Sequence, residues 1–98
     1  MMTGSDVTSL RSSLGLKPNA FAAILGVHPS SLYRWESACG EEVLVDPLQV
    51  HLLVSLHDVV KKRSSGAQKE LGQQLFRALI LKGALFALFT LLKVVFEV

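Results

Sequence analysis

The chain has 98 residues, of which 50% are hydrophobic and 18% are charged, and its formal net charge is +2. Disordered chains have few apolar residues and a high net charge, so this composition excludes disorder and predicts one domain with a short appendage. One cysteine, Cys39, excludes an internal disulfide and a cysteine-rich zinc site. Because a lone cysteine suits a reducing compartment and residues 1–6 lack the features of a secretory signal, we expect a cytoplasmic protein.

Apolar residues are spaced as in helices, and strand signals are absent, which predicts an all-α fold. A first helix is predicted to be capped by Asp6 and to end at Gly15. A second helix begins near Pro18, which the first turn tolerates, and ends at Gly26, and a third begins at Pro29. The residues expected to face inward are Val7, Leu10, Leu14, Phe21, Ala22, Ile24, Leu25, Leu32 and Trp35.

The second half of the chain is also predicted to be helical. An acidic, extended loop is expected between Cys39 and Asp46, and Asp46-Pro47 is typical of a helix start. That fourth helix closes on the cations of residues 61–63, at the negative end of the helix dipole. Ser64-Ser65-Gly66 is typical of a linker, and a last helical region is expected from about 67 to 97, broken or kinked near Gly83.

The second and third predicted helices are joined by a tight turn at Gly26, and the small Ala22 lets their backbones approach. This is the sequence pattern of a helix-turn-helix. Residues 7–38, about a third of the chain, resemble without gaps the Cro/phage-repressor (XRE) helix-turn-helix family. The residues that carry this resemblance most strongly are Ala22, Gly26, Val27, Leu32, Trp35 and Glu36.

The resemblance implies roles for particular residues. Arg11 and Glu36 occupy the positions of a structural ion pair that the family usually contains. Arg34 is the best candidate for reading a base edge, because its guanidinium matches the two acceptors of guanine. The residues implied to face DNA are Lys17, Asn19, His28, Pro29, Ser30, Ser31, Tyr33 and Arg34.

The sequence departs from the family pattern in ways that affect DNA binding. The recognition helix opens with the short residues Pro29-Ser30-Ser31, where long polar residues are common, and the glycine expected after Glu36 is displaced to Gly40. The DNA-facing segment is also scarcely basic. Because phosphate neutralisation supplies most of the affinity for DNA, we expect one copy to bind weakly and dimerisation to be close to a requirement.

No constellation of catalytic or metal-binding residues is evident in the sequence. His51 and His57 are six residues apart, so they do not share a helical face, and no carboxylate is in ligand register with them. Cys39 lacks an obvious histidine partner, and no nucleophile elbow, P-loop or zinc-binding histidine motif is present. We therefore expect no enzyme activity, no metal site and no cofactor.

The C-terminal segment is strongly apolar, which leaves three interpretations: a membrane attachment, packing onto the N-terminal helices, or an oligomer interface. Only ten residues separate Lys82 from Lys93, whereas a span needs about 20 apolar residues. A helix that is apolar nearly all round is not covered by its own domain alone, so we favour an oligomer. The predicted interface comprises Leu75, Leu79, Gly83, Phe86, Phe89, Leu92 and Phe96.

Together these observations predict an all-α protein in which a repressor-like helix-turn-helix four-helix domain, residues 5–63, precedes a hydrophobic helical oligomerisation segment, residues 67–98. The expected function is that of a bacterial or phage transcriptional regulator, a repressor that binds a palindromic operator in double-stranded DNA as a homodimer at the nucleoid. The alternative is a non-enzymatic adaptor whose hydrophobic tail docks a partner protein or a membrane.

Overall fold

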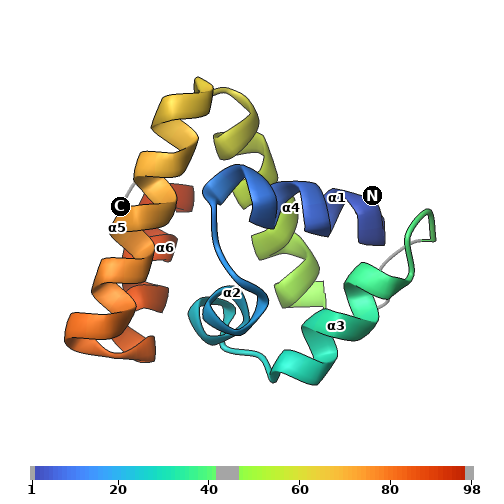
Figure 1. Cartoon of the computed structure of the whole chain (residues 1–98), viewed down its shortest axis with the longest axis horizontal. Coiled ribbons are helices and arrows are strands. Elements are labelled where there is room, and N and C mark those ends of the chain that lie inside the picture. Colours follow the sequence, from blue (N-terminus) through green and yellow to red (C-terminus); the bar gives the residue numbers. More distant parts are fainter. Residues whose placement is uncertain (1, 42–46, 97–98) are drawn as a thin grey trace.

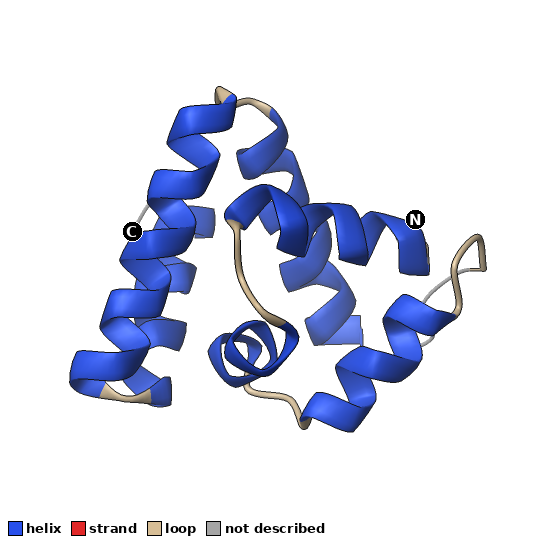
Figure 2. Cartoon of the chain, viewed as in Figure 1, coloured by secondary structure: helices blue, strands red, loops and turns tan. Residues whose placement is uncertain are grey.

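A computed structural model describes residues 2–41 and 47–96, with the side chains of 47 and 48 left aside. Within these ranges the chain forms helices and no strand, which confirms the all-α fold class (Figure 2). The helices are α1 (Gly4–Leu14), α2 (Pro18–Leu25), α3 (Pro29–Ser37), α4 (Pro47–Lys61), α5 (Ser65–Lys82) and α6 (Ala84–Phe96).

Helix α2 lies at the centre of the arrangement, with α5 on one side and α3 on the other (Figure 1). Helix α1 packs against α3, α4 and α5, and α6 packs against α2, α4 and α5. Helices α5 and α6 form a hairpin that breaks at Gly83, where φ is 96°, as the sequence predicts. The C-terminal hairpin therefore lies against the helices that precede it.

All six described helices contribute to one apolar core. The inward stripes predicted for the first three helices are confirmed, because each of their residues is buried. From the C-terminal hairpin, Leu71, Leu75, Ala87 and Leu91 join the same core. The predicted interface residue Leu75 is thus fully buried inside its own chain, which corrects its assignment to a surface between copies. The division of the chain into residues 5–63 and 67–98 stays a prediction.

The N-cap of helix α1 lies three residues earlier than predicted, at Thr3 and not at Asp6. Thr3 is the N-cap: its Oγ1 accepts a hydrogen bond from the Asp6 backbone N–H at 3.2 Å, and its own N–H donates to Asp6 Oδ2 at 3.0 Å. This reciprocal pair is a capping box, which satisfies two N–H groups at the helix start. The carboxylate of Asp6 therefore supports the cap from inside the first turn. Gly15 ends the helix with φ at 69°, as predicted.

The predicted linker is shorter than the sequence suggests. Helix α4 ends at Lys61 and α5 begins at Ser65, so Ser65 and Gly66 belong to the first turn of α5. Ser64 caps that helix, with its Oγ accepting from the Ala67 N–H at 3.3 Å. Gln68 Nε2 donates to the Val60 carbonyl at 2.8 Å and so joins α5 to the end of α4. The corner between α4 and α5 is a capped turn.

The predicted acidic loop and the predicted absence of a membrane span concern other parts of the chain. Most of the predicted acidic loop, residues 42–46, lies outside the described residues. As for a membrane span, no helix in the described ranges is both long enough and apolar enough to cross a bilayer.

Candidate functional site

The connection between α2 and α3 consists of Gly26, Val27 and His28. Gly26 has φ at 75°, a left-handed conformation that glycine adopts without strain. The Val27 N–H donates to the Ala22 carbonyl at 3.0 Å, and the Gly26 N–H donates to the Ala23 carbonyl at 3.2 Å, which closes the end of α2. The chain therefore turns into α3 within a few residues, as the sequence predicts.

His28 is the N-cap of α3, a role that the sequence reading did not assign to it. Its Nδ1 accepts a hydrogen bond from the Ser30 backbone N–H at 3.1 Å and lies 2.8 Å from Ser30 Oγ. Pro29 follows as the first helical residue, where its missing N–H costs nothing. The side chain of His28 thus holds the start of α3, and the ring remains exposed.

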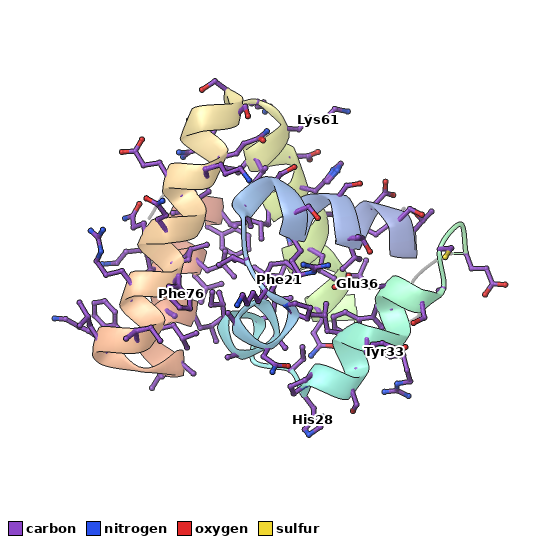
Figure 3. The ribbon with its side chains drawn as sticks, viewed as in Figure 1. Phe21, His28, Tyr33, Glu36, Lys61 and Phe76 are labelled. Atoms are coloured by element: carbon purple, nitrogen blue, oxygen red, sulfur yellow. The ribbon has the colours of Figure 1, made fainter. Side chains whose placement is uncertain are left out.

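Helix α3 presents one face to the core and the other to solvent. Leu32 and Trp35, three residues apart, are buried against the other helices. On the opposite face Tyr33 is 74% exposed, and Arg34 is exposed with its Nη2 donating to Ser31 Oγ at 3.3 Å. Figure 3 shows Tyr33 and His28 at the periphery of the molecule. The outer face of α3 is therefore free to meet a partner.

A bidentate ion pair fixes α3 against α1. Arg11 Nε donates to Glu36 Oε2 and Arg11 Nη2 donates to Glu36 Oε1, both at 2.9 Å. Arg11 Nη1 also donates to the Leu16 carbonyl at 3.0 Å, and Thr8 Oγ1 donates to Glu36 Oε1 at 3.0 Å. The two charged side chains are only 18% and 14% exposed, and Glu36 lies between α3 and α1 in Figure 3. Thr8 was not anticipated, although it lies one turn before Arg11.

The end of α3 also packs closely on the start of α1. A Cβ on Gly4 would lie 2.3 Å from the Trp35 carbonyl oxygen and 2.6 Å from the Cys39 nitrogen, so this position requires glycine. Cys39 adopts the left-handed φ of 53°, and its carbonyl accepts a hydrogen bond from the Ser5 N–H at 2.8 Å. The exposed Cys39 therefore takes a left-handed backbone conformation that glycine adopts more readily than other residues.

The structure divides the predicted DNA-facing residues into two groups. Ser31 is half-buried, and the other members on the α3 segment are exposed: His28, Pro29, Ser30, Tyr33 and Arg34. Lys17 and Asn19 are exposed at the start of α2, where they line a groove shared with α5. Helix α2 has no side chain capping its first turn.

Few charged side chains lie on the segment that contains α2 and α3. Between residues 17 and 37 the charged side chains are Lys17, Arg34 and Glu36. Glu36 is neutralised by Arg11 at 2.9 Å, which leaves Lys17 and Arg34 as the outward charges of the segment. The surface is therefore positive, with a small charge.

A second surface is apolar and belongs to the C-terminal hairpin. Of the residues predicted for an interface, Gly83, Phe86, Phe89 and Phe96 are exposed. Leu79 and Leu92 are half-buried and pack against the apolar core. Other large apolar side chains on the hairpin are also exposed, and the sequence reading did not assign them to the interface: Phe76, Ile80, Leu81 and Leu85. Phe76 and Ile80 are four residues apart on α5, and Leu85 is four residues from Phe89 on α6, a spacing that places each pair on one helical face.

His51 has a packing role. The ring of His51 stacks on Phe96 with centroids 6.0 Å apart and an interplanar angle of 19°. Across residues 2–41 and 47–96, no three metal-ligating side chains come together.

Comparisons of the chain with protein-family models, with curated proteins and with solved structures find no match.

Proposed function

We propose that the protein is a sequence-specific DNA-binding transcriptional regulator in which α3 is the recognition helix. The observation that carries this proposal is the outer face of α3. Tyr33 and Arg34 project to solvent from a helix that is fixed by two buried side chains and by the Arg11–Glu36 pair. A rigid helix with an exposed polar face is suited to enter a major groove. The pairing of Glu36 with Arg11 matters because an unpaired carboxylate on this helix would be repelled by the DNA phosphates.

Within this proposal each exposed residue has a defined contact. Arg34 reads the two acceptors of a guanine, and the Ser30 hydroxyl oxygen, whose hydrogen faces His28 Nδ1, accepts from a neighbouring base. Lys17 and the free backbone N–H groups at the start of α2 contact phosphate, because a helix N-terminus favours negative charge. Since few side chains read bases, DNA shape contributes to the choice of sequence.

The small charge of the site is the reason for a dimer. The two outward cations of one chain contribute little electrostatic free energy to DNA binding. In a dimer, the two copies of α3 can bind half-sites about one DNA turn apart. The proposed dimer face is the outer side of α6, where Leu85 is 68% exposed and Phe89 54% exposed. A two-fold dimer reads a palindromic operator, and occupancy of the operator at the nucleoid in the cytoplasm represses transcription.

Selection from a random double-stranded DNA library at low salt tests the proposal. The wild type should enrich a sequence with dyad symmetry, and Arg34→Ala should lose its preference at one position per half-site. The expected discrimination at that position falls by about 1–3 kcal/mol. Arg63→Ala is the matched control, because this arginine lies at the α4–α5 corner, at the far end of the molecule from α3 (Figure 1). No retained DNA, or the same motif for Arg34→Ala, would overturn the proposal.

The second candidate is a non-enzymatic adaptor, and the exposed apolar surface of the hairpin is the observation that favours it. Such a protein would dock a partner through α5 and α6 without contacting DNA. The same selection distinguishes the two functions, because an adaptor retains no DNA at any salt concentration.

A further inference from the structure

A groove of about 690 Å³ runs between α2 and α5, on the side of α2 away from α3. Its walls are apolar and come from the end of α1, from α2 and from α5. The apolar lining residues are Leu14, Leu16, Ala20, Phe76, Leu79 and Ile80. A volume of about 300–1,000 Å³ is typical of small-molecule sites. The groove is therefore large enough for a ligand and presents mainly hydrocarbon to it.

Two lysines are among the residues that line this groove. Lys17 precedes α2, and Lys69 on α5 extends over Gly15, where an added Cβ would lie 3.7 Å from Lys69 Nζ. The other polar residues of the lining are the uncharged Asn19 and Gln73. No acidic side chain is among the residues that line the groove. The lining of the groove thus combines two ammonium groups with an apolar trough.

Phe76 and Ile80 are left partly open to solvent in this trough. They are 45% and 65% exposed and lie one helical turn apart on α5. Figure 3 shows Phe76 on α5, across α2 from the labelled residues of α3. Leaving large apolar side chains in water is unfavourable, so a site with this composition gains from an apolar ligand.

We propose that this groove binds a single-chain amphipathic carboxylate, of the chemical class of a fatty acid. The alkyl chain lies along Phe76 and Ile80, and the carboxylate lies between Lys17 and Lys69. Charge selects this occupant: a second copy of the chain would bring the same two lysines against these two. An anionic head on an apolar tail complements both parts of the lining.

Occupancy of the groove should also change DNA binding, an expectation that rests on the proposed function. Lys17 is the residue proposed to contact phosphate, and it also lines the groove. A bound carboxylate takes the ammonium of Lys17 away from DNA. Laurate is therefore expected to weaken DNA binding, so that the ligand releases the regulator from its operator.

Isothermal titration of the full chain with laurate, kept below its micellar concentration, tests the site. Laurate should bind with one site per chain, and the double variant Lys17→Gln/Lys69→Gln should lose about tenfold in affinity. Ile80→Gln should lose a similar factor. Leu81→Gln is the matched control, because Leu81 is as exposed as Ile80, at 71%, but does not line this groove. Its affinity for laurate should equal that of the wild type.

Several results would overturn the proposal. An absence of laurate binding would do so, as would an affinity for dodecyltrimethylammonium equal to that for laurate. Equal losses of laurate affinity in Ile80→Gln and Leu81→Gln would do so as well. The proposal also fails if the chain binds anionic vesicles but not free laurate, or if Ile80→Gln converts a dimer to a monomer. The proposed function fails separately: laurate binding without any DNA binding would refute the regulator and leave the groove assigned. DNA binding without laurate binding would refute the groove alone.

Discussion

Replacing Gly72 by alanine tests how the C-terminal hairpin is held on the rest of the fold. Gly72 lies inside α5 where this helix crosses the end of α1. A Cβ at this position would lie 1.7 Å from the Leu14 carbonyl oxygen and 2.7 Å from the Leu14 carbonyl carbon. Both atoms are backbone, so no side-chain rotation relieves the clash. The helices must separate.

The size of the effect follows from that separation. Ordinary contact begins at 3.4 Å, so the added methyl group must move away from the Leu14 oxygen by up to 1.7 Å, the difference of the two distances. Overpacking of this kind costs about 1–3 kcal/mol or more, and the neighbouring Leu71 and Leu75 lose part of their packing. Alanine returns about 1 kcal/mol through helix propensity. Because a clash with backbone atoms falls at the upper end of the overpacking range, the net loss in the free energy of unfolding should be about 2 kcal/mol, which lowers Tm by about 8–16 °C.

Thermal unfolding followed by far-UV circular dichroism measures this loss. Gly66→Ala is the matched control: it lies in the first turn of the same helix with nothing within 4 Å of the added Cβ. Its Tm should stay the same or rise slightly, because alanine favours the helix. A Gly72→Ala variant as stable as wild type would refute the close crossing of α5 over α1.

Three further predictions concern the caps, the ion pair and the apolar surface. The hydrogen bond from the Thr3 N–H lowers the pKa of Asp6, so its carboxylate stabilises the fold above the ordinary aspartate pKa. Denaturant melts of Asp6→Asn should therefore show a deficit at pH 7 that disappears as the pH falls through the lowered pKa; a constant deficit would contradict this. Glu36→Gln leaves Arg11 partly buried without its anion, so the free energy of unfolding measured in urea should fall by about 2–3 kcal/mol. A loss below about 0.5 kcal/mol would contradict a stabilising role of the Arg11–Glu36 pair. Native mass spectrometry should show a wild-type dimer and a Phe89→Glu monomer, so a monomeric wild type at micromolar concentration would exclude the dimer face.

Helix ends and the inward stripes were predictable from the sequence because they depend on local chemistry. Gly15 and Gly26 adopt left-handed φ values, and Leu32 and Trp35 face inward at helical spacing. The cap at Thr3 was missed, since an acid at Asp6 serves equally well as a cap or as the third residue of a capping box.

Features that depend on contacts between distant segments were not predictable from periodicity. Glycine has a low helix propensity, and nothing in the periodicity marks Gly4 or Gly72 as a close contact. Each is nevertheless required where another backbone passes within contact distance. Leu75 reads as part of an exposed stripe and is buried, because α5 folds back onto α1 and α2. The groove at Lys17 and Lys69 has the same origin, since residues on separate helices form it.

The ratio of two affinities tests the central claim that α3 recognises a DNA sequence. The wild-type chain is titrated at one salt concentration with its selected site and with a scrambled duplex of the same length and composition. The selected site is expected to bind about a thousandfold more tightly than the scrambled duplex, as is typical of specific recognition. Equal affinities for the two duplexes would contradict it.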